Sequence, residues 1–249
     1  MDVNGGQLEV IDIAGQPAWA PVVLLHSGAG SVAGWRDFPE RLAEATGRRV
    51  VAYSRLGHGQ SAPLRQVPGA DFMHREARTT LPALLQQMRI DRCALVGHSD
   101  GASIATIFAA EFSERIPALV LMAGHYFVED ETLDAIRAAG DRYRHSGPPS
   151  VLVRIHADPE AAFRAWHDVW LSPAFRSMDL RSTLRLVRCS ILVMQGVDDE
   201  FSSKAQVDSV ATNAAGAVTT VMVPGGHFPH TEAAVETLDA VVRFLRLVA

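Results

Sequence analysis

Short apolar runs alternate along the chain with longer segments whose apolar residues recur at the period of a helix. The runs cover residues 22–25, 50–53, 94–96, 119–122, 191–194 and 218–223. Short aliphatic runs that end near Gly, Ser, Asp or His are typical of strands buried on both faces of a parallel sheet. Helical spacing is found between them, at residues 38–45, 77–88 and 103–112. The pattern therefore predicts an α/β fold, a mostly parallel central sheet flanked by helices on both faces.

The N-terminal residues predict a hairpin. Asn4-Gly5-Gly6 is a turn-forming sequence, and residues 8–13 after it alternate between apolar and polar positions. We expect a first strand, cut short at residues 1–3, before this turn.

One stretch, residues 127–187, contains no run that predicts a buried strand. Glu131 to Arg144 has the spacing of a helix, and Asp158 followed by Pro159 is typical of a helix start. A last helix is expected at 180–187, so some 60 helical residues lie between two strands of the sheet. We predict three segments: 1–126, the first part of the core; 127–187, an inserted helical cap; and 188–249, the second part of the core.

Composition narrows the class of protein. The chain has 249 residues, 48% of them hydrophobic, which suits one globular domain, or one domain with an insertion. Its 23 basic and 28 acidic residues give a net charge of −5, which argues against a nucleic-acid partner. The apolar runs are far shorter than the roughly 20 residues of a membrane span, so no membrane partner is expected. The N-terminus has no signal-peptide pattern, and we expect a cytoplasmic protein. The sequence carries no signal for an oligomeric state.

The strongest chemical motif is Gly97-His98-Ser99-Asp100-Gly101. It follows a predicted strand and precedes a helix expected to begin near Ser103. A serine between two glycines at a tight strand-to-helix turn is the nucleophile elbow, which exposes the hydroxyl above the end of the sheet. The sequence therefore predicts Ser99 as a nucleophile.

A serine hydroxyl needs a base, and the base needs an orienting acid. His227 follows the last predicted strand directly after two glycines, and His230, three residues on, is the weaker candidate for the base. Asp198 and Asp199 follow the preceding predicted strand. Since open α/β sheets carry their sites at the carboxyl ends of the strands, either aspartate can reach the histidine.

These motifs resemble the α/β-hydrolase superfamily, in particular its carboxylesterases and carbon–carbon bond hydrolases with a helical cap. The resemblance covers nearly the whole chain. It includes four motifs: His26-Ser27-Gly28, similar to the family's oxyanion loop; Gly57-His58-Gly59-Gln60-Ser61; the acid turn 196–199; and Gly226-His227-Phe228. The chain departs from the family pattern at Ser27, where Gly is usual, and at Leu56, where Arg is frequent, with Arg55 one place earlier.

The resemblance implies Asp199 as the acid, with Asp198 as the alternative. Some relatives place the acid after the preceding sheet strand, which leaves Glu129 and Asp130 open as further alternatives. Two backbone N–H groups should form the oxyanion hole. One is that of Asp100, and the other is that of Gly28 or, as second choice, Ser27.

The resemblance also implies a serine hydrolase that cleaves a small, largely apolar carboxylic ester through an acyl-enzyme on Ser99, with a small-molecule substrate. No cofactor and no metal are expected, because the triad needs neither and only two cysteines, Cys93 and Cys189, are present. The expected pocket residues are His125, Trp166, Trp170 and Phe228. Two other functions stay open: a carbon–carbon bond hydrolase of ring-fission products, and a small-molecule receptor that retains the triad.

Overall fold

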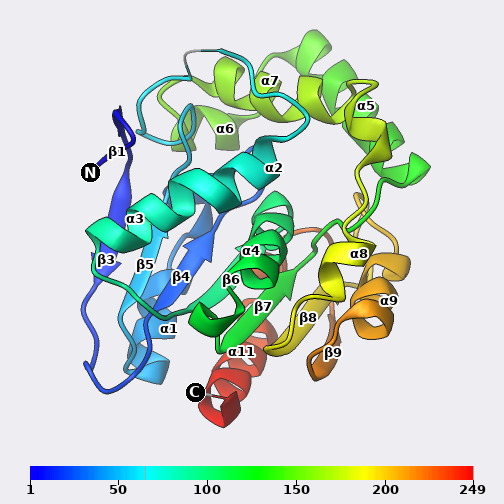
Figure 1. Ribbon diagram of the computed structural model, residues 1–249. Coiled ribbons are helices and arrows are strands. Elements are labelled where there is room, and N and C mark those ends of the chain that lie inside the picture. Colours follow the sequence, from blue (N-terminus) through cyan, green and yellow to red (C-terminus); the bar gives the residue numbers. More distant parts are fainter. Residues whose placement is uncertain (65, 249) are drawn as a thin grey trace.

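A seven-stranded sheet forms the centre of the molecule (Figure 1). The computed structural model describes residues 1–64 and 66–248. The strand order is β3-β5-β4-β6-β7-β8-β9, and all neighbours are parallel except β3 and β5. The strands are β3 (Val10–Ile13), β4 (Val22–Leu25), β5 (Val50–Tyr53), β6 (Ala94–His98), β7 (Ala118–Met122), β8 (Ser190–Gly196) and β9 (Val218–Val223). The predicted α/β fold with a mostly parallel sheet is confirmed.

Alternate residues of each central strand enter two separate hydrophobic cores. Val22 and Leu24 of β4 pack in one core with α1 (Phe38–Thr46) and α11 (Ala234–Val248), while Val23 and Leu25 pack in the other. The second core lies against the opposite face of the sheet (Figure 1). Its helices are α2 (Phe72–Arg75), α3 (Leu81–Gln87), α4 (Asp100–Glu111), α8 (Arg181–Leu184) and α9 (Lys204–Asn213), with a π-helical turn at Glu76–Thr80. Burial on both faces explains why these strands are apolar throughout rather than alternating.

The predicted N-terminal hairpin is present. β1 (Asp2–Val3) pairs antiparallel with β2 (Gly6–Gln7) around Asn4 and Gly5, which both have positive φ. Of the alternating segment expected at 8–13, residues 10–13 form β3, and β2 lies before it. β3 leaves the hairpin and joins the edge of the main sheet next to β5.

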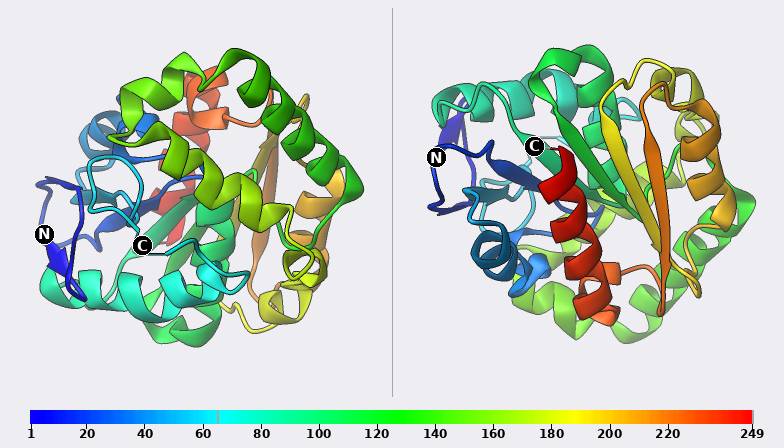
Figure 2. Two further views of the ribbon diagram at one scale, coloured as in Figure 1. Left: turned by 90° about the horizontal axis from the view of Figure 1, so that it is seen from above. Right: turned by 90° about the horizontal axis from the view of Figure 1, so that it is seen from below.

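Three helices lie over the carboxyl ends of the strands: α5 (Asp130–Ser146), α6 (Ser150–Ile155) and α7 (Pro159–Trp170) (Figures 1 and 2). We call them the cap helices. α7 begins as expected, with Asp158 accepting a hydrogen bond from the Ala161 N–H at 2.9 Å. Short 3₁₀ turns lie at Val32–Trp35, Ser113–Arg115 and Phe175–Ser177, and α10 spans Pro229–Glu232. None of the helices within residues 1–64 and 66–248 is both long enough and apolar enough to span a membrane.

The end of the predicted insertion packs differently from the rest of it. We expected the helix at 180–187 to belong to the cap, but α8 lies beside α4 and α9 (Figure 1). Leu184 and Val187 are buried in the same core as α4. The spacing of apolar residues predicts that a helix packs on a hydrophobic surface, but it does not identify that surface. For α8 the surface is formed by α4 and α9, which flank the sheet.

Candidate active site

The nucleophile elbow is formed where β6 ends and α4 begins. Ser99 has φ 55° and ψ −120°, a strained backbone, and α4 starts at Asp100 rather than near Ser103. A Cβ on Gly97 would lie 2.3 Å from the Gly101 carbonyl oxygen, and one on Gly101 would lie 2.0 Å from that of Leu25. The turn therefore has no room for a side chain at position 97 or 101, as the motif predicted.

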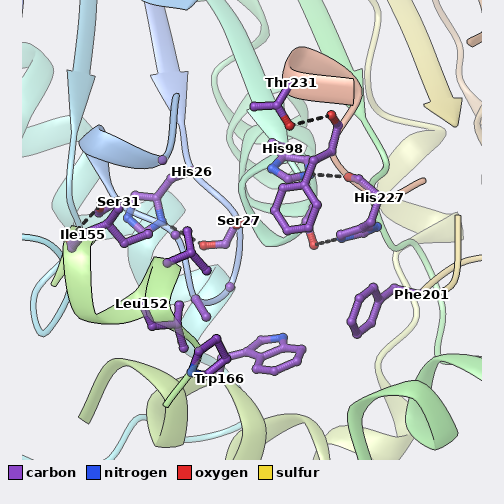
Figure 3. A pocket seen from close by; sticks show the side chains of 18 of the residues that line it. His26, Ser27, Ser31, His98, Leu152, Ile155, Trp166, Phe201, His227 and Thr231 are labelled. Atoms are coloured by element: carbon purple, nitrogen blue, oxygen red, sulfur yellow. Dashed lines mark hydrogen bonds between the residues drawn. The ribbon is translucent and has the colours of Figure 1, made fainter. Parts of the chain in front are cut away.

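Ser99, His227 and Asp199 form a continuous hydrogen-bonded chain, and His227 lies in the cavity wall (Figure 3). His227 Nδ1 lies 2.9 and 3.0 Å from the two carboxylate oxygens of Asp199. A carboxylate only accepts hydrogen bonds, so Nδ1 carries the proton. Nε2 is then free to accept the hydrogen bond of the Ser99 hydroxyl, 3.0 Å away. This tautomer is the one a general base at Ser99 requires.

Asp199 is fully enclosed and held by several donors. Its side chain has 0% exposure and accepts hydrogen bonds from the N–H groups of Phe201 and Ser202 and from the Ser202 hydroxyl. Burial alone would raise its pKa, but the hydrogen bond and positive charge of His227, together with these donors, outweigh burial and lower the pKa of Asp199. The carboxylate therefore stays ionised beside His227 at neutral pH.

The alternative acids lie elsewhere. Asp198 is exposed at the surface. Glu129 accepts a hydrogen bond from Gln206 at 2.7 Å and helps to fix the start of α9. Asp130 is exposed and pairs with Arg176. The structure thus brings Asp199 to His227, and none of these three alternatives.

Two further histidines lie next to the triad without touching Ser99. His98 Nε2 donates to the carbonyl oxygen of His227 at 2.7 Å and so fixes the loop that carries it (Figure 3). His230, the second candidate for the base, lies in α10, where its Nε2 contacts the Gly34 carbonyl oxygen at 3.3 Å. Both rings are buried, and both contact backbone carbonyl oxygens of the loops around the site.

Two of the expected oxyanion-hole donors, Gly28 and Asp100, keep their backbone N–H groups unbound by any acceptor among the described residues. The N–H of Ser27 is likewise unbound. Gly28 lies in the loop after β4, and Asp100 is the first residue of α4. Gly28 and Ser99 line the same cavity, and Asp100 directly follows Ser99. Unbound N–H groups at such positions are what a developing oxyanion requires.

A buried arginine holds the loop that carries Gly28. Arg55 donates to the carbonyl oxygens of His26 at 3.1 Å, Ser27 at 2.9 Å and Gly28 at 3.1 Å. His58 Nε2 lies 2.9 Å from the same Gly28 carbonyl oxygen. These three carbonyl oxygens are thereby bound by Arg55, and the N–H groups of Ser27 and Gly28 bond to no acceptor among the described residues. The sequence showed Arg55 only as a displaced family residue, since nothing in it pointed to the loop as its partner.

The carboxylate of Asp100 points away from the cavity that Ser99 lines. It is 1% exposed, and one oxygen accepts a hydrogen bond from Trp170 Nε1 at 3.1 Å. Burial raises the pKa of Asp100, against the opposing effects of Arg55 and of the Trp170 hydrogen bond. Its backbone N–H and its side chain therefore face different surroundings.

A cavity of about 790 Å³ opens between the triad and the cap helices (Figure 3). The four residues expected in the pocket, His125, Trp166, Trp170 and Phe228, all line it. Sequence reasoning missed Phe201, whose ring centroid lies 5.0 Å from that of His227. It also missed the apolar wall formed by Leu152 and Ile155 of α6 and by Ile136 of α5. No motif marks such residues, because their place depends on how α5 and α6 pack.

Charge is confined to a few lining residues. The charged residues of the described wall are Arg36, Arg154 and Glu232, and both arginines are exposed. The polar groups closest to Ser99 are buried histidines instead. Within the described part of the chain, no group of three or more His, Cys, Asp or Glu side chains is placed to hold a metal ion.

Comparisons with known proteins agree with this architecture. A family model described as the alpha/beta hydrolase fold matches residues 20–169, more than half of the chain. The 2-hydroxy-6-oxo-2,4-heptadienoate hydrolase of Pseudomonas putida is 31% identical over 208 residues, 72% of each chain. The dihydrolipoyllysine-residue acetyltransferase component of the acetoin cleaving system of Pseudomonas putida is 29% identical over 167 residues, 66% of this chain. That match covers 42% of the relative, so the chain spans less than half the length of the first curated relatives it matches.

Solved structures share the fold over the full length. The enol-lactonase from Burkholderia xenovorans LB400 superposes with a TM-score of 0.80 at 20% identity and covers 99% of both chains. A thermophilic esterase from Thermogutta terrifontis gives a TM-score of 0.74 at 20% identity, covering 97% of this chain and 93% of the other. With the family model, the sheet order and the elbow in agreement, this chain belongs to the α/β-hydrolase family.

Proposed function

We propose that the protein is a serine hydrolase that cleaves a small, largely apolar carboxylic ester through an acyl-enzyme on Ser99. The observation that carries the proposal is the hydrogen-bonded chain from Ser99 through His227 to Asp199, set beside unbound N–H groups of Gly28 and Asp100. This arrangement supports acyl transfer, which needs a nucleophile, a base and an acid in one hydrogen-bonded chain.

The first half of the reaction forms the acyl-enzyme. Ser99 Oγ attacks the ester carbonyl carbon while His227 Nε2 takes the hydroxyl proton. The N–H groups of Gly28 and Asp100 stabilise the oxyanion of the tetrahedral intermediate. When the carbon–oxygen bond to the alcohol breaks, the imidazolium of His227 protonates the leaving oxygen, and Asp199 stabilises that imidazolium.

Hydrolysis of the acyl-enzyme repeats the same steps with water. His227 takes a proton from the water, whose oxygen attacks the acyl carbon. Collapse of the second intermediate releases the carboxylic acid and returns the proton to Ser99. The residues present supply every proton transfer, so the cycle closes without a further reactant.

An ester substrate is supported by the character of the cavity. Its wall is largely aliphatic and aromatic, and Ser99 and His227 both line it. Arg36 and Arg154, the lining cations, are exposed. The buried guanidinium of Arg55 is occupied by loop carbonyl oxygens. These features suit a neutral substrate better than one with a buried carboxylate.

Carbon–carbon bond hydrolysis is the second candidate. It is favoured by the 31% identity to the 2-hydroxy-6-oxo-2,4-heptadienoate hydrolase, a protein named for an anionic substrate. The two candidates share the fold and differ in the charge of the substrate. A direct comparison of the two substrate classes on one preparation separates them, and a receptor would turn over neither at a useful rate.

The test combines labelling with kinetics. A fluorophosphonate should modify the wild type at Ser99, identified by peptide mass, and p-nitrophenyl esters graded in acyl length should be hydrolysed. Ser99→Ala should lower kcat by at least about 10³-fold, because nucleophile and base act as a unit. Ser113→Ala, a change outside the cavity, serves as the matched control and should retain full activity. Near wild-type turnover by Ser99→Ala, or turnover of a 2-hydroxy-6-oxo-dienoate alone, would reject the proposal.

A further inference from the structure

His125 is a cavity-lining histidine close to the triad that the proposed mechanism does not use. It follows β7, is 3% exposed and lines the cavity. Its ring centroid lies 5.7 Å from that of His227 and 4.9 Å from that of Trp170, whose ring it meets edge to face. The imidazole is thereby fixed in orientation next to the place where a bound ester must lie.

Its ring nitrogens have no hydrogen-bond partner among the described residues. Nδ1 is completely buried and unpartnered, whereas Nε2 is not enclosed, and the surface it faces is the cavity. The other buried histidines around the site are bonded: His26 and His98 to carbonyl oxygens, and His156 to both Gly59 and Ala29. His230 also has an unpartnered Nδ1, but its Nε2 contacts the Gly34 carbonyl oxygen. The enclosed Nδ1 of His125 is out of reach of a ligand, so Nε2, on the cavity side, is the nitrogen through which His125 can bond to one.

The charge of His125 restricts what that ligand can be. Burial, with a smaller contribution from His227, lowers the pKa of His125 to about 3. The ring is therefore uncharged at neutral pH and offers one donor or one acceptor. A neutral imidazole matches a hydroxyl or a carbonyl oxygen, and it gives a carboxylate no counter-charge.

We propose that His125 Nε2 recognises a neutral hydroxyl group of the substrate, which lies a few bonds from the scissile carbonyl group. This rests on the proposed ester hydrolysis and narrows its substrate class to short esters that carry such a group. The apolar wall of α5 and α6 binds the remainder of the substrate, and His125 sets its orientation. Either the acyl part or the alcohol part of the ester can carry the recognised group.

The experiment measures a preference within matched pairs of substrates. The acyl arm compares p-nitrophenyl butyrate with p-nitrophenyl 3-hydroxybutyrate, and the alcohol arm compares propyl butyrate with 2-hydroxyethyl butyrate. In the wild type, kcat/KM should favour the hydroxylated member of one pair by about tenfold, the effect of one net hydrogen bond. His125→Phe should abolish the preference, and His125→Gln, which keeps a donor and an acceptor, should retain part of it. His145→Ala, an exposed change in α5, should keep the wild-type ratio.

Binding to a non-hydrolysing protein tests the same inference without turnover. In a Ser99→Ala background, calorimetry should give the same ratio of dissociation constants for the favoured pair, and His125→Phe should remove it. Loss of esterase activity in the wild type would overturn the proposed function but leave this ratio measurable. A wild type that discriminates in neither arm, or a His125→Phe protein that still does, would overturn the role of His125.

Discussion

An alanine at Gly28 tests whether the loop position that we assign to the oxyanion hole is set by the cap. The added Cβ would lie 2.1 Å from Trp166 Cδ1 and 2.7 Å from Trp166 Nε1, whereas ordinary contacts begin at 3.4 Å. The φ of Gly28 is not positive, so alanine meets no backbone strain there. The three atoms nearest to the added Cβ all belong to the indole of Trp166. The loop or the indole must therefore retreat by more than about 1 Å, a displacement that near reacting atoms costs about 10²-fold in rate.

The expected result is a fall of about 10²-fold in kcat/KM for every ester in the panel. In a Trp166→Ala background the obstacle is gone, and the same Gly28→Ala change should cost less than about fivefold. The difference corresponds to a coupling free energy of about 2 kcal/mol between the two positions. Steady-state kinetics on the wild type, the two single variants and the double variant measure it.

Gly34→Ala is the matched control, since its added Cβ would meet only Ile155 Cδ1, at 3.9 Å, and should leave activity near wild type. An equal loss from Gly28→Ala in both backgrounds would refute contact with Trp166 as the cause. Full activity of the single variant would mean that the indole swings aside freely, and the cap would then not set the position of Gly28.

Two further predictions follow from the acid and from the buried histidines. Asp199→Asn should lower kcat by about 10⁴-fold, because the amide favours the wrong tautomer of the catalytic imidazole. The exposed Asp198→Asn should change kcat less than about twofold. If steady-state kinetics rank the two variants in reverse, Asp198 is the acid instead. In the unfolded chain, histidines have a pKa near 6.5. In the folded protein, burial lowers the pKa of His58 and His125 to about 3 and that of His230 to about 4. The unfolded state therefore binds more protons, and the free energy of unfolding should fall as the pH drops from about 6.5 to about 4. Urea titrations across this range should show His125→Gln reducing that slope by about 1.4 kcal/mol per pH unit, and an unchanged slope would contradict a neutral buried ring.

The common location of the triad residues could be predicted because it follows from the parallel direction of the strands, whereas the choice of Asp199 over Asp198 came from the family resemblance. The runs at 22–25, 50–53 and 218–223 coincide with β4, β5 and β9. Once the strands are known to be parallel, residues just past their carboxyl ends must share one edge of the sheet. Ser99, Asp199 and His227 come together for this reason, although the sequence separates them widely.

The supports of the site could not be predicted, because their partners are distant in sequence and no spacing pattern records them. Arg55 bonds to the loop at His26 to Gly28, and His156 bonds to Gly59 and to Ala29. Periodicity tells which side of an element is buried but not what it is buried against. For the same reason the location of α8 was predicted wrongly, since the pattern of its apolar residues is compatible with packing in the cap or against the helices beside the sheet.

The loop that carries Gly28 is held from two directions, which makes catalysis and selectivity interdependent in this molecule. From the core, Arg55 binds its carbonyl oxygens. From the cap, His156 Nε2 donates to the Ala29 carbonyl oxygen at 3.0 Å, and the Ile155 carbonyl oxygen accepts the Ser31 hydroxyl at 3.0 Å. The cap helices thus form one wall of the cavity and also fix the loop beside Ser99. A change that widens the cavity by moving α6 or α7 must also move that loop, and the rate of acyl transfer changes together with the size of the substrate admitted.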